Sequence, residues 1–228
     1  MGRTSDANER LMDAALALMW EESYGAVTID DICHRADVKK GSFYYFFSSK
    51  AELLVAALER LWEHEWKPAL DRQFSPSIEP LQRLTSYLDG FYQRQVETKA
   101  RTGKVLGCLV CSVGSEISTQ EIDVSAKIRE VTSRKRRYYE STIRDAIAAG
   151  VIEPCDPAQR ALALVGLIEG IVSQARIMND PELVRELPAM ALGLLRVKNA
   201  SSFAALPSSS SAVPGAVLAP LVEPTLSH

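Results

Sequence analysis

Two stretches of this 228-residue chain carry residues whose types and spacing could do chemistry. The first lies between residues 39 and 50, where two lysines and a Gly41–Ser42 pair precede five consecutive aromatic residues. Lysines and helix-start amides hold phosphates, and small residues at a helix start leave room beside base edges in the major groove. The hydroxyls of Tyr44 and Tyr45 can also reach phosphate oxygens. The stretch therefore predicts an element that binds DNA.

The second stretch is an apolar segment, residues 103–118, which predicts a buried helix beside a cavity. Cys108 and Cys111 lie three residues apart in it and would share one face of that helix. Such a pair can act in a thiol-dependent redox enzyme, can react as a sensor, or can simply pack as small buried side chains. No metal site is predicted, because no second Cys/His pair follows at a suitable spacing, and no cofactor is expected.

Two short helices joined by a tight turn, over residues 28–50, must position the first stretch. Thr28 is a predicted N-cap, and Asp31 three residues later completes a capping box. Ala36–Val38 forms the turn, and the second helix begins at Lys39. Spacing alone would also suit a small hairpin closed by an aromatic core. The residue types are therefore what favours a DNA-binding helix-turn-helix.

This combination of residues resembles the helix-turn-helix of the TetR family of bacterial repressors, whose motif runs roughly K-G-x-x-Y-x-x-F-x-x-K-x-x-L. The residues that match it are Lys40, Gly41, Tyr44, Phe47, Lys50 and Leu53. The resemblance implies contacts to the DNA backbone from Thr28, Lys39, Tyr44 and Lys50. It implies contacts near the bases from Lys40, Gly41, Ser42 and Tyr45. Position 46 is Phe where members often carry a phosphate-contacting His, so no contact is expected there.

Helical periodicity continues to about residue 198 and predicts an all-α fold. We expect a three-helix DNA-binding domain over residues 1–50 and a larger helical ligand-binding and dimerisation domain over residues 51–198. The further helices are predicted from Lys50 to about Pro68, after Pro80, over 123–149, from Pro157 to about Asn179, and from Asp180–Pro181 onward. Residues 199–228 are rich in Ser, Pro and Ala and are predicted to be a disordered tail.

The helix predicted after Pro157 is apolar almost all round from Ala161 to Ile168. A helix of this composition must be buried on more than one side, and a second subunit would cover the side that its own subunit leaves open. In the TetR family the last two helices form a four-helix interface with those of the partner. The resemblance therefore implies a homodimer.

Charge and cysteine usage limit the classes of protein that the chain can belong to. The net charge is −3, which argues against indiscriminate coating of nucleic acid, but basic residues cluster between 35 and 50. Four cysteines at irregular positions and an N-terminus without an apolar segment indicate a reducing cytoplasm. The longest apolar run, Ala161–Ile168, is far shorter than the roughly 20 residues of a membrane span, so no membrane partner is expected.

A second, finer resemblance concerns the cysteine segment. Gly107-Cys108-Leu109 followed by Glu116 resembles a G-C-L…E segment in an electrophile-sensing branch of TetR-type repressors, in which the corresponding cysteine reacts. The lysine partner of that cysteine aligns with Arg176, which keeps the positive charge but has a different geometry. The resemblance thus implies a sensor at Cys108 and Arg176; Cys111 is a further candidate with no counterpart in that branch.

Together these features predict a TetR-type transcriptional regulator rather than an enzyme. It would bind a palindromic double-stranded operator as a dimer, and a small-molecule inducer or modification of Cys108 would release it. The alternative is an all-helical redox enzyme that uses Cys108 and Cys111. Helical disulfide-forming peroxidases place a histidine shortly after such a pair, whereas the nearest histidine here is His64.

Overall fold

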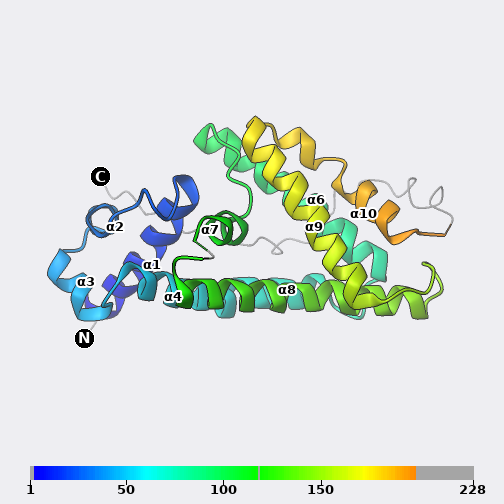
Figure 1. Cartoon of the computed structure of the whole chain (residues 1–228), viewed down its shortest axis with the longest axis horizontal. Coiled ribbons are helices and arrows are strands. Elements are labelled where there is room, and N and C mark those ends of the chain that lie inside the picture. Colours follow the sequence, from blue (N-terminus) through cyan, green and yellow to red (C-terminus); the bar gives the residue numbers. More distant parts are fainter. Residues whose placement is uncertain (1–2, 118, 199–228) are drawn as a thin grey trace. The chain divides into compact units, whose positions relative to one another are not determined.

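The computed structural model describes residues 3–117 and 119–198, and within them it confirms the predicted all-α class (Figure 1). The only pairing of the strand type in this part of the chain is an isolated bridge between Ile152 and Val197. The predicted tail over 199–228 lies outside the described residues. In order, the elements are α1 (Arg3–Glu21), α2 (Ile29–Arg35), α3 (Lys40–Phe46), α4 (Lys50–Leu61), a π-helix η1 (Trp62–Trp66), α5 (Lys67–Gln73), α6 (Pro80–Thr102), α7 (Leu109–Ile117), α8 (Ile122–Ala148), α9 (Pro157–Met178), a 3₁₀ helix η2 (Pro181–Val184) and α10 (Leu187–Leu195).

The described residues fall into two compact units that are not continuous in sequence. The N-terminal unit contains the chain up to Lys67 together with Cys108–Thr132, and the C-terminal unit contains Pro68–Gly107 and the described residues from Ser133 onward. The boundary predicted after residue 50 would isolate the first three helices. In the structure α4 and α7 group with those helices, whereas α8 begins in one unit and ends in the other.

The core of the N-terminal unit forms around α1, which packs against α2, α3, α4 and α7. Its apolar residues recur at helical spacing, so one stripe of each helix faces this core. Side chains that are completely buried are Leu11, Ala15, Met19, Ile32, Phe43, Leu53 and Leu54. Because three separate helices contribute to one core with α1, the two short helices of the turn are held by tertiary packing rather than by their own helix propensity.

The helix that begins at Lys50 continues past Pro68, further than the predicted end at about that residue, and contains a π turn just before the proline. Proline has no amide hydrogen and its ring clashes with the carbonyl one turn earlier. Here the amide of Lys67 donates to the carbonyl of Trp62, five residues back, which widens the helix just before the proline. The helical path then ends at Gln73.

The prediction of one helix over residues 103–118 is wrong at its N-terminal end. Gly103 and Gly107 adopt left-handed backbone conformations with φ of 74° and 70°, and α7 begins only at Leu109. Within the C-terminal unit, the amide of Gly107 donates to Gln95 at 3.0 Å, and the Gln95 amide group donates to the Gly107 carbonyl at 3.3 Å. Cys108 therefore lies one residue before the helix, and Cys111 lies in its first turn.

The last predicted helix is divided in two. Asp180 caps a short 3₁₀ helix by accepting from the amide of Glu182 at 3.1 Å, and α10 starts separately at Leu187. Pro188 explains the division, because a proline is accepted in the first turn of a helix but not in its interior.

Helix α9 is capped at both ends. Asp156 accepts from the amides of Ala158 and Gln159 at 2.9 and 3.2 Å, and Asn179 ends the helix in a left-handed conformation. As a whole, α9 is long and apolar enough to cross a membrane by length and composition, although the run from Ala161 to Ile168 is not. Only 22% of its most apolar window is buried within the chain, so much of this apolar surface is exposed.

Candidate functional site

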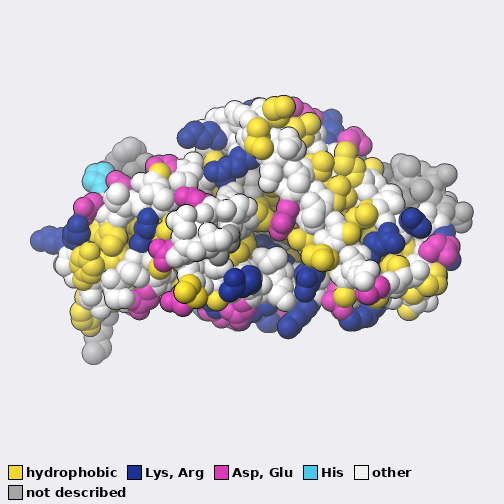
Figure 2. All heavy atoms as spheres, viewed as in Figure 1, with side chains coloured by type: hydrophobic (Ala, Val, Ile, Leu, Met, Phe, Trp, Pro, Cys, Tyr) yellow, Lys and Arg dark blue, Asp and Glu magenta, His cyan; other side chains and the backbone are white. Residues whose placement is uncertain are grey.

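Helix α3 divides its aromatic residues between the core and the surface. Phe43 and Phe47 are 0% and 6% exposed, whereas Tyr44 and Tyr45 are 55% and 77% exposed. Figure 2 shows hydrophobic side chains gathered over the α3 end of the N-terminal unit, with basic side chains beside them. The buried pair fixes α3 to the core, and the exposed pair is left for a partner.

The start of α3 combines small side chains with a positive charge. Lys40 lies within 2.8 Å of Asp30 on α2, and this hydrogen bond raises the pKa of the lysine. Both side chains are exposed, so a phosphate or base acceptor can replace Asp30 at little cost. A Cβ added at Gly41 would meet no atom within 4 Å, so packing within the protein does not require glycine there. A small residue at position 41 instead leaves room for an external surface to approach the start of α3.

Thr28 forms the predicted capping box at the start of α2. Its hydroxyl accepts from the amide of Asp31 at 3.1 Å, while the Asp31 carboxylate accepts from the Thr28 amide at 2.9 Å. The Thr28 hydroxyl also donates to that carboxylate at 2.6 Å. These bonds hold the pKa of Asp31 below its ordinary value. Thr28 is exposed, but its hydroxyl already has partners within the protein.

Lys50 has a structural role that the motif did not suggest. Its ammonium group donates to the carbonyls of Tyr24 and Val27 at 2.6 and 2.7 Å and lies 4.2 Å from the centre of the Tyr24 ring. It thereby ties the start of α4 to the loop between α1 and α2. A contact from Lys50 to DNA stays a prediction, and at most one of its three N–H groups is left to make it.

Arg10, on α1, supports the turn of the helix-turn-helix and was not singled out from the sequence. Its guanidinium donates to the carbonyls of Ala36 and Asp37 at 2.7 and 3.2 Å. Asp37 has a φ of 50°, a conformation that Asp and Asn accept more readily than most residues. Arg10 thus fixes the carbonyls of the turn that sets the angle between α2 and α3.

A second unpredicted contact holds the loop between α1 and α2 from the side of α7. The carboxylate of Glu116 accepts from the consecutive amides of Tyr24 and Gly25, at 2.9 and 2.7 Å. The hydroxyl of Tyr24 donates to Glu121 at 3.1 Å. A Cβ at Gly25 would approach the Glu116 carboxylate to 2.8 Å, so a larger residue at this position would displace that side chain. We call this arrangement of Glu116 with Tyr24 and Gly25 the loop clasp.

The predicted sensor residues lie in different units. In the N-terminal unit, Cys108 and Cys111 are both half-buried, and the carbonyl of Cys108 accepts the amide of Ser112 at 2.9 Å. In the C-terminal unit, Arg176 donates to the carbonyl of Leu106 at 2.8 Å. The pairing of Arg176 with Cys108 stays a prediction.

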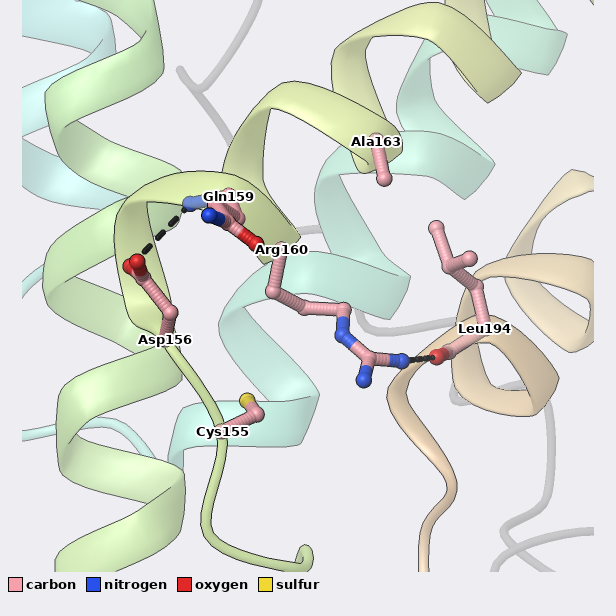
Figure 3. Close-up of a pocket in the computed structure, with 6 residues that line it drawn as sticks. All are labelled: Cys155, Asp156, Gln159, Arg160, Ala163 and Leu194. Carbon is pink, nitrogen blue, oxygen red and sulfur yellow. Dashed lines mark hydrogen bonds between the residues drawn. The ribbon is translucent and has the colours of Figure 1, made fainter.

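A small pocket in the C-terminal unit lies between the start of α9 and the end of α10 (Figure 3). Its volume of about 240 Å³ is below the range usual for ligand sites. Asp156 is occupied in capping α9, and Arg160 donates to the carbonyl of Leu194. The two charged side chains are therefore already engaged, and the pocket is not a good candidate for an inducer site. Its lining residues are Cys155, Asp156, Gln159, Arg160, Ala163 and Leu194.

Comparison with known proteins places this architecture among helix-turn-helix transcriptional regulators. A family profile described as bacterial regulatory proteins, tetR family, matches residues 11–57, and one described as tetracyclin repressor-like, C-terminal domain, matches residues 80–190. The transcriptional regulator AcuR of Cereibacter sphaeroides is 32% identical over 178 residues, covering 77% of this chain and 79% of that protein. The chain belongs to the TetR family. It is thus a transcriptional regulator with a helix-turn-helix DNA-binding domain and a C-terminal ligand-binding domain.

Two solved structures show the same fold. The regulatory protein TetR from Rhodobacter sphaeroides has a TM-score of 0.71 at 30% identity, covering 81% of this chain and 96% of that chain. Reduced NemR from Escherichia coli has a TM-score of 0.72 at 22% identity, covering 85% and 97%. In sequence, the repressor NemR is 25% identical over 182 residues, which does not assign the chain to an electrophile-sensing branch. The family and these relatives are regulators, so the redox-enzyme alternative has no support from them.

Proposed function

We propose that this protein is a homodimeric repressor that binds a palindromic operator through α3 and leaves it when an inducer acts on the C-terminal domain. The main support for this proposal is the way that α3 and its C-cap separate their aromatic residues. Phe43 and Phe47 are buried, whereas Tyr44 and Tyr45 are exposed. Neighbouring large aromatic side chains exposed on one helix are typical of an interaction surface. DNA binding as a dimer is a general feature of the family.

In this proposal the major groove receives α3 with its N-terminal end toward the bases. Contacts near the bases would come from Lys40, Gly41, Ser42 and Tyr45. Contacts to phosphates would come from Thr28, Lys39, Tyr44 and Lys50. Within the second set Lys39 and Tyr44 have the greater freedom, because Thr28 and Lys50 already have partners in the protein. We therefore assign most of the phosphate affinity to Lys39 and Tyr44.

The dimer would form through α9 and α10. Both helices leave apolar side chains exposed, and a Cβ added at Gly166 or Gly170 would meet open space. A face that combines small residues with exposed apolar ones allows a second helix to approach closely. Figure 2 shows hydrophobic side chains over this part of the C-terminal unit. The exposed apolar residues are Leu162, Ile177, Met178, Leu183 and Met190.

This face also bears on where the protein works. A second copy of the same face would bury the apolar surface of α9, so a membrane is not needed to explain its composition. TetR-type regulators are typically cytoplasmic, and we propose the same for this protein.

Release from DNA would act through α7. Cys108 immediately precedes this helix, and Glu116 in its last turn holds the loop between α1 and α2. A ligand or a covalent modification that displaces α7 would strain the loop clasp and so alter the position of α2, which follows the loop directly. Such a change lowers DNA affinity only if the effector binds the displaced state better than the DNA-bound state.

Tyr45→Ala tests the DNA-binding proposal. Loss of a base contact should weaken binding to the protein's own upstream DNA by about 1–3 kcal/mol, or roughly 5- to 150-fold. Tyr92→Ala, on α6, is the matched control and should bind as wild type. Fluorescence anisotropy measures the affinity, and light scattering checks that both variants stay dimeric. Equal affinity of Tyr45→Ala and wild type would overturn the assignment of α3.

Cys108→Ser tests the covalent form of release, with Cys111→Ser as its control. N-ethylmaleimide should release wild type and Cys111→Ser from operator DNA but leave Cys108→Ser bound. If N-ethylmaleimide leaves wild type bound, Cys108 has a packing role and release is non-covalent.

A further inference from the structure

Helix α6 carries a guanidinium that the fold leaves incompletely paired. The Nη2 atom of Arg94 is buried and has no hydrogen-bond partner among the residues that the structure describes. A buried ionised group without a partner costs several kcal/mol, and such groups in native proteins normally have a partner. Burial also lowers the pKa of Arg94, which reflects the same loss of water around the charge.

Contacts within α6 fix the position of this guanidinium. Arg94 lies with its Cζ 5.4 Å from the centre of the Phe91 ring, within the range of a cation–π contact. A Cβ added at Gly90 would lie 3.4 Å from Nη1, so the guanidinium folds back over Gly90, one turn earlier on α6.

Aromatic rings on α6, on α8 and just after α5 lie close to one another beside this group. Tyr87 on α6 and Tyr139 on α8 both act electrostatically on Arg94. Their rings lie 5.9 Å apart, and Phe74, just after α5, lies 5.4 and 5.7 Å from them. Thr142 is one turn beyond Tyr139 on α8 and has a buried hydroxyl that also has no partner in the described part of the chain.

The remaining charge on this group is positive. Glu97 is the carboxylate that acts on Arg94, but it is exposed and lies one turn further along α6. Helical side chains lean toward the N-terminus, so the guanidinium over Gly90 points away from Glu97. The guanidinium therefore keeps a positive charge that a single carboxylate can pair with.

We infer that Arg94, with Tyr87, Tyr139 and Thr142 around it, is the anchoring site for an inducer that is a small organic carboxylate. A guanidinium offers two parallel N–H donors that match a carboxylate, and the phenol and threonine hydroxyls can complete its hydrogen bonds. The aromatic rings suit an apolar body on the same molecule. The regulatory meaning of the site rests on the proposed function, but binding at the site does not.

Thermal unfolding of the full-length protein tests binding at Arg94 directly. The probes are acetate, propionate and benzoate, with propionamide and benzamide as uncharged counterparts and chloride at matched ionic strength. At tenfold excess over Kd, one of the acids should raise the Tm of wild type by about 3–6 °C. Arg94→Met should lose this response, whereas Arg101→Met, at an exposed site on the same helix, should keep it.

The unliganded variants give a second readout. Arg94→Met removes a largely buried guanidinium whose Nη2 atom has no hydrogen-bond partner among the described residues, so it should melt at least as high as wild type. Arg94→Lys keeps the charge without the paired donors, so it should fold and respond to the acids less than wild type. Circular dichroism checks the fold of both variants.

Each result decides the inference. It is overturned if no acid shifts wild type more than Arg94→Met, if chloride or the amides act as well as the acids, or if unliganded Arg94→Met melts more than about 4 °C below wild type. Operator binding is measured separately. A protein whose Tm responds through Arg94 but that binds no operator would contradict the proposed function while supporting the carboxylate site.

Discussion

The stability lost when the loop clasp is removed can be estimated from its hydrogen bonds. Glu116→Ala removes two hydrogen bonds, at 2.9 and 2.7 Å, from the consecutive amides of Tyr24 and Gly25. Glu116 is exposed, so each bond is expected to contribute about 0.5–1.5 kcal/mol rather than the larger value of a buried charged bond. The variant should therefore lose about 2 kcal/mol of stability, equivalent to a fall in Tm of about 4–8 °C.

Gly25→Ala provides an independent perturbation of the same contact. Its Cβ would lie 2.8 Å from the Glu116 carboxylate, which must move and give up a bond, at a cost of about 1 kcal/mol. In a Glu116→Ala background the added methyl group meets no carboxylate. The double-mutant cycle should therefore give a coupling energy of about 1 kcal/mol.

Urea unfolding measures the unfolding free energies of wild type, the two single variants and the double variant. Hydrogen exchange reports on the amides of Tyr24 and Gly25 directly. Tyr24→Phe is the control, because it removes the bond to Glu121 but leaves both amide bonds to Glu116. Amide protection at Tyr24 and Gly25 should fall in Glu116→Ala and not in Tyr24→Phe. Additive effects in the cycle, or a Glu116→Ala variant within about 0.5 kcal/mol of wild type, would refute the reasoning.

Three further predictions concern other contacts. Hydrogen bonds from Thr28 lower the pKa of Asp31 below its ordinary value of 3.8. The stability that these bonds contribute is therefore fully present above pH 3.8 and is lost as the pH falls through the folded-state pKa. In thermal melts below about pH 4, the Tm of Asp31→Asn should fall less steeply with pH than the Tm of wild type. Lys50→Met should lower the unfolding free energy by about 2 kcal/mol in urea titrations, because two carbonyls lose a charged donor; an unchanged value would show that water replaces it. Gly166→Glu should yield folded monomers in light scattering, and a persistent dimer would place the interface elsewhere.

The helix-turn-helix could be predicted from sequence because its signals are local. The capping box of Thr28 and Asp31 lies within four residues, and it forms as predicted. The cap of α9 at Asp156 is also a local contact, made to amides two and three residues further along the chain. Signals of this kind depend on the backbone near the residue itself, so they do not require knowledge of the tertiary fold.

Two kinds of feature correct or extend the prediction: residues that interrupt helices, and contacts between residues far apart in the sequence. Gly103, Gly107 and Pro188 were visible in the sequence, and they interrupt helices that the apolar pattern alone extends too far. Glu116 is 91 residues beyond Gly25, and no local pattern indicates that the two meet. Lys50 satisfies a DNA-binding motif, yet its position beside Tyr24 gives it a role in the fold as well.

Protection of the protein's own upstream DNA against nuclease digestion tests the central claim most directly. The account predicts a protected palindrome whose half-sites are separated by about 34–36 Å along the helix axis, or a multiple of that distance. Tyr45→Ala should need roughly 5- to 150-fold more protein to give the same protection. Uniform protection of promoter and unrelated duplex, or the same footprint with Tyr45→Ala, would contradict sequence-specific recognition through α3.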